Sequence, residues 1–394
     1  MPAQRLIIVA ASISAPGQMG GNTKIAIEMA RNLPALGWTV EVVVPSQKLA
    51  TFANAIGTPA GLRYHPIKGL SGEFRHFFSS IRLYTREFAR AFARLNVSAR
   101  DIVYATCNFH FEIVPLVFLK RRFNYIYLPS HYLFSPFIIE NLVRGYRFPA
   151  IKWLVVWIYE RLFFCLARTV ADGFVITNDS DRRYFGKSWS ASLFPVYGGV
   201  NVEQIPGGSC EKTRDAVFCS RLHPQKGVES LLEIWSNVIT IVPSARLSLV
   251  GNGASSYEKF LRKRAAELGV ASNIEWLGYV NNEAKYRIYK SATVFVHSTI
   301  YDNNGMVAAE ALCSGLPVVM YDLPALRTVY TDGCAKVPFG DSRAFAETIA
   351  RLLTDADYRS TVAPSEETVA RLKDRWNWPN RMVRLSDFLK GLHG

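Results

Sequence analysis

Cysteines are few in this 394-residue sequence, and they follow no pattern that would pair them. The six cysteines, at positions 107, 165, 210, 219, 313 and 334, form no close pairs. The sequence therefore predicts neither a zinc site nor a disulfide framework, and a reducing cytoplasm is the compartment that it favours.

Hydrophobic runs long enough to cross a bilayer are also missing. The most apolar stretch, residues 151–166, contains Lys152, Glu160 and Arg161 and falls short of the ~20 apolar residues that a span needs. We expect it to be a helix packed on a sheet. The amino terminus has only a five-residue apolar core, residues 6–10, which predicts a first buried strand and not a signal peptide.

Acidic residues are scarce in the first half of the chain. Residues 1–200 carry 23 Lys and Arg against 11 Asp and Glu, whereas residues 201–394 carry 23 against 21. A basic half predicts an anionic partner. Because the sequence has no zinc finger, no aromatic RNA-binding strand and no basic heptad run, nucleic acid is disfavoured. An anionic membrane surface or a phosphate-bearing acceptor is the better hypothesis.

Part of this excess lies in residues 74–95, which have the pattern of an amphipathic helix. One side is apolar, and the other carries arginines at a spacing of four: Arg82, Arg86, Arg90 and Arg94. Such a stripe is either a solvated face above the core or a patch that binds anionic headgroups. The charge excess of the first half favours the membrane patch.

Short apolar runs alternate with helical patterns along the chain, as is typical of α/β domains with parallel sheets. In the first such unit a strand at 6–10 is followed by a helix from about 24 to 36 and a strand at 39–44. The length predicts two or three domains. A passage rich in Pro and Gly, residues 193–201, places a boundary near 200. The predicted parts are residues 1–200, residues 201–375 and a helical tail, residues 376–394.

Two features of the first half are candidate ligand contacts. Gly20 and Gly21, at the start of the first helix, would let a ligand approach the backbone, although a glycine pair fits an ordinary tight turn equally well. His131 follows a strand expected at 125–129 and would lie at the carboxyl edge of the sheet, where ligands bind. A lone histidine is more often a local hydrogen-bonding residue, and His110 competes for the same role.

The strongest pattern is the stretch 302–319, which follows an apolar run at 293–297. It contains a short polar turn, a helix of small residues and a second apolar run, which is how a nucleotide site is built at the edge of a parallel sheet. We expect Asn304 to cap the helix and leave the N–H groups near Gly305 and Val307 for a phosphate. Glu310, inside this apolar helix, needs a polar partner, because an unpaired buried carboxylate is costly.

A second pattern combines two cations. Arg221 follows the strand expected at 216–220, and Lys226 precedes Gly227 and a helix. A planar guanidinium and a mobile ammonium together suit a diphosphate. Two surface cations in a loop would not by themselves predict a binding site. The prediction rests on their position directly after a buried strand.

At these residues the chain resembles the family-four retaining glycosyltransferases of the GT-B fold. The family signature has two glutamates separated by seven residues, and here Asp302 and Glu310 occupy the two positions, with Asn303 in place of the first glycine. Arg221 and Lys226 match the Arg and Lys of the family. The resemblance implies two Rossmann-like doubly wound domains that face each other across a cleft, with a C-terminal helix that crosses back to the first domain.

The resemblance also implies roles for individual residues. His131, Arg221, Lys226 and Asp302 would be catalytic, with Asp302 on the sugar hydroxyls, and Glu310 would bind the ribose. The other implied substrate contacts are Gly20, Gly21, Gly253, Val280, Asn303, Asn304, Gly305, Met306 and Val307. No metal or cofactor is implied, because Arg221, Lys226 and the helix N-terminus would stabilise the leaving diphosphate of a UDP- or GDP-sugar.

The implied function is metal-independent transfer of a hexose, with retention, to a hydroxyl acceptor that is lipid-linked or part of a cell-envelope glycan. The enzyme would be cytoplasmic and peripheral at the inner face of the membrane. Two alternatives stay open. One is another GT-B enzyme, with a soluble acceptor or with sugar-nucleotide epimerase activity, and the other is a non-catalytic polyanion-binding protein.

Overall fold

The computed structural model describes residues 4–11, 20–68, 77–132, 134, 150–208 and 210–392. These residues form two compact units. The chain leaves the first unit after Gly198, builds the second unit as far as Asn377, and returns to the first unit at Trp378. The boundaries predicted from the sequence were 200 and 375.

The first unit is built on a seven-stranded parallel sheet with the order β3-β2-β1-β4-β5-β6-β7. Its strands are β1 Gln4–Val9, β2 Trp38–Pro45, β3 Leu62–Ile67, β4 Ile102–Ala105, β5 Ile126–His131, β6 Phe174–Ile176 and β7 Leu193–Pro195. Its helices are α1 Gly21–Asn32, α2 Leu49–Ile56, α3 Phe77–Leu95, α4 His110–Phe123, α6 Ala150–Arg168 and α15 Trp378–Gly391.

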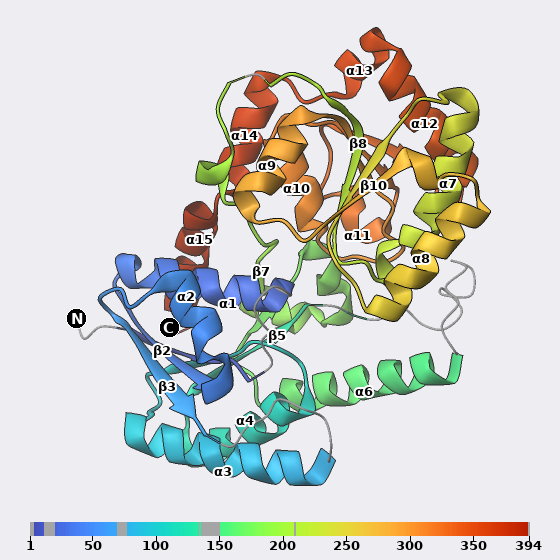
Figure 1. The fold of residues 1–394 in the computed structure, drawn as a ribbon. Coiled ribbons are helices and arrows are strands. Elements are labelled where there is room, and N and C mark those ends of the chain that lie inside the picture. The colour runs from blue at the N-terminus through green and yellow to red at the C-terminus, as the bar shows by residue number, and fades with distance from the viewer. Residues whose placement is uncertain are drawn as a thin grey trace. The chain divides into compact units, whose positions relative to one another are not determined.

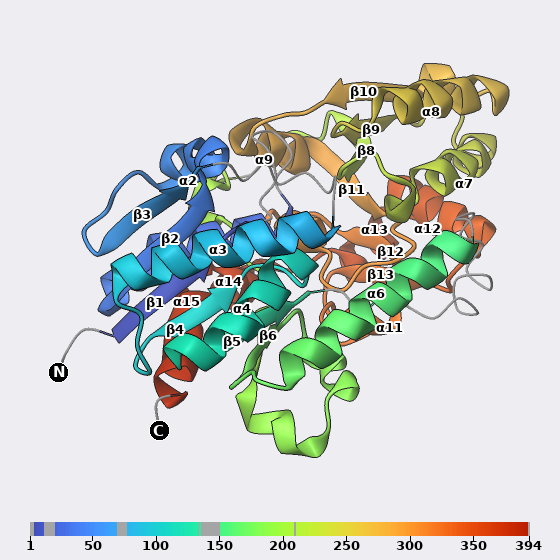
Figure 2. The same cartoon turned by 90° about the horizontal axis from the view of Figure 1, so that it is seen from below.

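Helices cover both faces of this sheet, which is why its central strands are apolar on both sides. The helices α3, α4 and α6 lie side by side on one face (Figures 1 and 2). Their inner side chains, such as Phe88, Phe92 and Phe164, form one core with the strands. The helices α1 and α15 pack together.

The second unit has a six-stranded parallel sheet with the order β10-β9-β8-β11-β12-β13. Its strands are β8 Arg214–Cys219, β9 Leu247–Val250, β10 Ile274–Gly278, β11 Ala292–His297, β12 Val318–Tyr321 and β13 Cys334–Val337. Its helices are α7 Val228–Ile241, α8 Ser255–Glu267, α9 Asn282–Ser291, α10 Met306–Cys313, α11 Pro324–Arg327, α12 Ser342–Thr354, α13 Ala356–Val362 and α14 Glu366–Trp376.

Both sheets confirm the predicted class of two parallel-sheet, Rossmann-like domains. Strand order reverses between β1 and β4 in the first sheet and between β8 and β11 in the second. At such switch points the loops after the two strands diverge to opposite faces, which leaves a crevice for ligands. The loops that follow β8 and β11 carry Lys226 and Asp302.

Some predicted boundaries were wrong by a few residues. The first helix begins at Gly21 and not at 24, and β5 runs on through His131 and does not end at 129. α2 and β3 were not predicted at all. The segments 12–19 and 74–76 lie outside the described residues. Within the described helices, none is both long and apolar enough to cross a bilayer.

Candidate active site

The predicted catalytic residues Lys226 and Asp302 form an ion pair at the switch point of the second sheet. The Lys226 Nζ lies 2.5 Å from Asp302 Oδ2, and both side chains are largely buried. Burial opposes ionisation of Asp302, but the positive charge of Lys226 and the hydrogen bonds to the carboxylate hold its pKa well below the usual value. Asp302 is therefore ionised at neutral pH and lies in contact with Lys226.

The loops that carry this pair are joined by close backbone packing and by hydrogen bonds from side chains of each loop to the backbone of the other. Gly227 has a φ of +66°, and a Cβ at this position would lie 2.0 Å from the carbonyl oxygen of Ser298, so only glycine fits. The Ser298 hydroxyl donates to the carbonyl of Gly227 at 3.2 Å, and the side-chain amide of Gln225 donates to the carbonyl of Tyr301 at 2.8 Å. The position of Lys226 is thus fixed by the loop after β11.

The start of α10 differs from the prediction. The N-cap is Gly305, in the left-handed conformation with a φ of +60°, and Asn304 makes no capping hydrogen bond. Asp302 instead stabilises the turn before the helix, because its Oδ1 accepts hydrogen bonds from the N–H groups of Asn304 and Gly305, each at 3.1 Å. The hydroxyl of Tyr330 lies 2.7 and 2.8 Å from the carbonyl oxygens of Asn304 and Gly305. The N–H groups of Met306 and Val307 belong to the first turn, where no earlier helical carbonyl can accept them.

Glu310 has the polar partner that its position requires, and the sequence did not identify it. The Nζ of Lys285, on α9, lies 2.8 Å from Glu310 Oε2, and both side chains are mostly buried. Burial alone would lower the pKa of Lys285, but the negative charge of Glu310 raises it above 10.5. The sequence of α9, Asn282–Ser291, is mostly polar, so nothing in it distinguishes Lys285 from an exposed lysine.

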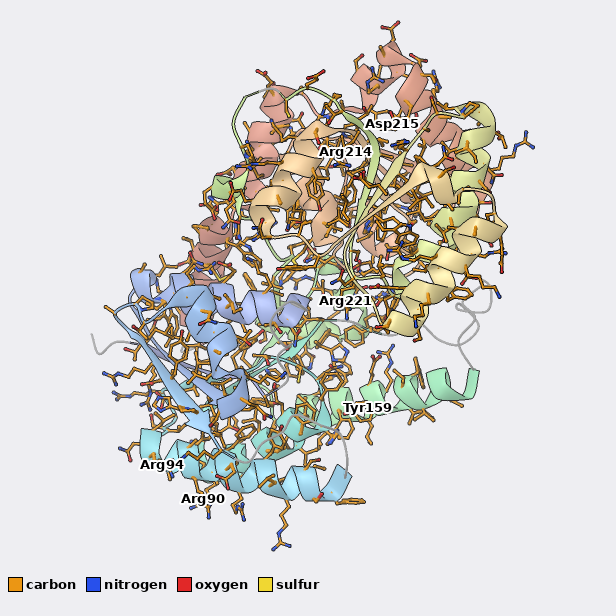
Figure 3. All side chains as sticks on the ribbon, viewed as in Figure 1. Arg90, Arg94, Tyr159, Arg214, Asp215 and Arg221 are labelled. Atoms are coloured by element: carbon orange, nitrogen blue, oxygen red, sulfur yellow. The ribbon has the colours of Figure 1, made fainter. Side chains whose placement is uncertain are left out.

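The remaining predicted contacts of the second unit lie on neighbouring loops at the same sheet edge. Arg221, labelled in Figure 3, is exposed in the loop after β8. Burial and the charges of Arg221 and Lys226 lower the pKa of His223, so both cations act on the same imidazole. Gly253 pairs with Leu222 in an isolated β-bridge. Val280 follows β10, whose Gly278 carbonyl accepts the N–H of Gly251 at 2.7 Å.

In the first unit, His131 ends β5 and is 1% exposed. Its ring is tilted by 31° against Phe134, with centroids 3.8 Å apart, and it meets Phe164 edge-on. His110 begins α4, and its ring contacts the hydroxyls of Tyr159 at 2.7 Å and Ser80 at 3.2 Å. Both histidines are thus held in aromatic or hydroxyl surroundings of the first unit.

The glycine pair lies at the switch point of the first sheet. Gly20 is the N-cap of α1 and Gly21 its first residue. The sequence missed a buried carboxylate nearby. Glu112 is 0% exposed and accepts hydrogen bonds from the N–H of Ala11 at 2.8 Å, the hydroxyl of Thr106 at 3.1 Å and the N–H of Cys107 at 3.1 Å. It joins the ends of β1 and β4.

The segment Asp179-Ser180-Asp181 follows β6, and such acidic pairs can bind Mg²⁺. Asp179 pairs with Arg182 at 2.7 Å, and Asp181 accepts the N–H of Thr177 at 3.3 Å. Over the described ranges, no group of three or more His, Cys, Asp or Glu side chains is placed to hold a metal ion.

Comparison with solved structures identifies the fold class. The chain superposes on sucrose-phosphate synthase from Thermosynechococcus elongatus with a TM-score of 0.77 at 16% identity, covering 99% of both chains. It superposes on Anabaena Alr3699/HepE, solved in complex with UDP-glucose, with a TM-score of 0.72 at 14% identity over 98% of this chain and 99% of that one. The two units are those of the GT-B glycosyltransferase fold.

The family follows from sequence comparison. Residues 203–367 match the family described as "Glycosyl transferases group 1". The matched residues lie in the second unit and include the pairs Lys226–Asp302 and Lys285–Glu310.

Sequence comparison also finds curated relatives of part of the chain. The chain is 31% identical to the phosphatidyl-myo-inositol mannosyltransferase of Mycobacterium leprae over 209 residues, which are 50% of this chain and 54% of that protein. It is 26% identical to the D-inositol 3-phosphate glycosyltransferase of Corynebacterium urealyticum over 225 residues, 52% of each. The chain thus spans about half the length of the curated relatives that it matches.

Proposed function

We propose that this protein is a retaining glycosyltransferase that moves a hexose from a UDP- or GDP-sugar to a hydroxyl acceptor. The observation that carries the proposal is the ion pair of Lys226 with Asp302 at the switch point of the group 1 domain. The UDP-glucose complex of Alr3699/HepE, with the same fold, supports a nucleotide-sugar donor.

The chemistry follows from charge. In the transition state a diphosphate gains negative charge while the sugar carbon becomes positive, so fixed cations near the leaving group lower the barrier. The ammonium of Lys226 and the N-terminus of α10 would supply this stabilisation without a metal, with Arg221 as a second cation. Asp302 would then be released to bind sugar hydroxyls, and Glu310 would accept the ribose hydroxyls.

Activity measurements on site variants test this proposal. With a panel of UDP- and GDP-sugars, we expect Lys226→Ala to lower kcat by about 10²- to 10³-fold, the usual effect of losing one electrostatic stabiliser. Glu310→Ala is expected to abolish turnover. The control is Lys263→Ala, an exposed cation of α8, which should turn over as wild type does.

Two results would count against the proposal. If Lys226→Ala left kcat unchanged, Lys226 would not be the group that stabilises the leaving diphosphate. A wild-type protein that binds polyanions but neither hydrolyses nor transfers any sugar of the panel would favour the non-catalytic alternative.

For the acceptor we propose a lipid-linked or cell-envelope glycan at an anionic membrane. Two curated relatives are named for inositol acceptors, one of them a phosphatidyl-inositol. The outer faces of α3 and α4 support this proposal, because Arg90 and Arg94 (Figure 3), together with Arg82 and Arg86, are exposed along α3.

Between α3 and α4 runs a groove of about 630 Å³ that combines apolar and cationic side chains. It is lined by Ile81, Arg82, Thr85, Arg86, Ala89, Arg90, Ala93, Phe118, Leu119 and Arg122. Phe78 and Phe118 are 83% and 59% exposed. Large exposed aromatics beside guanidinium groups suit the boundary between headgroups and acyl chains. Binding of vesicles tests this part of the proposal.

A further inference from the structure

Near the start of α10, two buried polar atoms have no hydrogen-bond partner among the residues that the structure describes. His297 ends β11, is 2% exposed, and its Nε2 has no hydrogen-bond partner in the described part of the chain. The Nε2 is directed at Gly305, because a Cβ on this glycine would lie 3.1 Å from it. The side-chain oxygen of Asn304, which is 9% exposed, is likewise buried and unpaired.

These two atoms stand out because their neighbours are satisfied. Asp302 is held by Lys226 and by two backbone N–H groups, and Tyr330 contacts the carbonyls of Asn304 and Gly305. A buried polar atom without a partner costs free energy, whereas an apolar side chain of the same shape would not. Two such atoms beside one helix N-terminus indicate a ligand that satisfies both.

The donor and acceptor character of the two atoms selects the kind of ligand. Burial lowers the pKa of His297 to about 4, although the charge of Asp302 opposes this, so the imidazole is neutral at physiological pH. A neutral imidazole nitrogen either donates or accepts, while an amide oxygen only accepts. A phosphate oxygen cannot donate to Asn304, but a hydroxyl group can.

We propose that His297 Nε2 and Asn304 Oδ1 hydrogen-bond hydroxyl groups of the transferred sugar and so help to select it. The inference rests on the proposed function and adds His297, which no sequence pattern singled out, to the residues around Asp302. The diphosphate would lie instead against Lys226 and the N–H groups of Met306 and Val307.

The test compares sugar-bearing and sugar-free ligands. Calorimetric titrations with UDP-glucose and GDP-mannose, and with UDP and GDP, are made on wild type, His297→Leu and Asn304→Leu. For the nucleotide sugar that wild type binds, we expect each variant to lose about tenfold in affinity, the usual effect of one hydrogen bond. Affinity for the matching nucleoside diphosphate should not change. The melting temperature should not fall, because an unpaired polar group has been replaced by an apolar one.

The outcomes separate the inference from the function on which it rests. Equal affinities of wild type and both variants for the nucleotide sugar would overturn the inference and leave the function intact. Equal losses for nucleotide sugar and nucleoside diphosphate would also overturn it, since they would indicate a displaced helix. If wild type bound none of the four ligands, the proposed function itself would fail. If His297→Leu does not fold, the affinities of Asn304→Leu decide whether the inference holds.

Discussion

At the scale of single residues, the second unit neutralises its two site carboxylates with one lysine each. Asp302 faces Lys226, and Glu310 faces Lys285. The need for a partner of Glu310 was predictable from the sequence, because a carboxylate inside an apolar helix is costly. The identity of Lys285 was not, since its contact with Glu310 bridges two helices across 25 positions of the chain.

Removing Lys285 should leave a poorly hydrated carboxylate without its cation. We expect Lys285→Met to lower the free energy of unfolding by about 2–4 kcal/mol, near the range for broken buried pairs. The double variant Lys285→Met with Glu310→Gln should recover most of the loss, because the charge that needed a partner is gone. Denaturant unfolding of the three proteins measures both effects. No recovery in the double variant would show that Lys285 acts through packing.

The same pair makes a prediction for alkaline pH. The folded-state pKa of Lys285 lies above 10.5, so folding retains a proton that the unfolded chain gives up first. Its contribution to stability is therefore complete below pH 10.5 and is lost as pH rises through the folded-state pKa. Melting temperatures measured between pH 8 and pH 11.5 should fall more steeply for wild type than for Lys285→Met.

At the scale of elements, the alternation of strands and helices was predicted well from the sequence. Hydrogen bonds between residues far apart in the chain were not. Buried parallel strands such as β1 and β11 can be recognised in the sequence as short apolar runs. β3 has three charged or polar residues on an edge of the sheet, so it lacks this signal. The hydrogen bond from the N–H of Ala11, after β1, to Glu112 joins residues about 100 positions apart, and no local pattern encodes it.

The capping error at α10 has a similar cause. Asparagine is a good N-cap in general, and Asn304 precedes the helix. Here, however, the carboxylate of Asp302 accepts the N–H groups of Asn304 and Gly305, and Gly305 is the N-cap of the helix. The turn that Asp302 stabilises thus places the N-cap one residue later than the general preference for asparagine predicts.

The outer face of α3 gives the prediction at this scale. We expect neutralisation of Arg82, Arg86 and Arg90 to glutamine to weaken binding to phosphatidylglycerol vesicles by about 100-fold, since each cation near an anionic surface contributes ~1 kcal/mol. Binding to phosphatidylcholine vesicles should be weak throughout. Vesicle sedimentation at low and high salt measures both.

A matched control is the glutamine triple variant of Arg100, Arg183 and Lys187, exposed cations of the first unit outside α3 and α4. This variant should sediment with vesicles as wild type does. Equal losses in both triple variants would mean that only net charge matters. Replacing Phe78 and Phe118 with serine should weaken the binding that survives high salt.

At the scale of the whole molecule, the first unit is discontinuous in sequence. α15 follows the second unit, yet its apolar side chains are buried in the first: Trp378, Met382, Leu385 and Leu389 are at most 1% exposed. The indole N–H of Trp38 donates to the hydroxyl of Ser386 at 2.9 Å, across 348 positions. Lys24 Nζ lies 5.9 Å from the ring centre of Trp378. The first unit therefore cannot complete its core until the second has been made.

Truncation after Asn377 should accordingly damage the first unit alone. At about 2 kcal/mol for each of the four buried apolar side chains, the loss is roughly 8 kcal/mol, which is comparable with the total stability of a typical domain. We expect calorimetry to show the transition of the first unit lost or shifted down by more than 10 °C, with that of the second unit unchanged. Truncation after Gly391 should shift neither, because α15 is then intact. Equal shifts of both transitions in the longer truncation would mean that the two units unfold as one cooperative body, and the discontinuous core would not be the weak point of the fold.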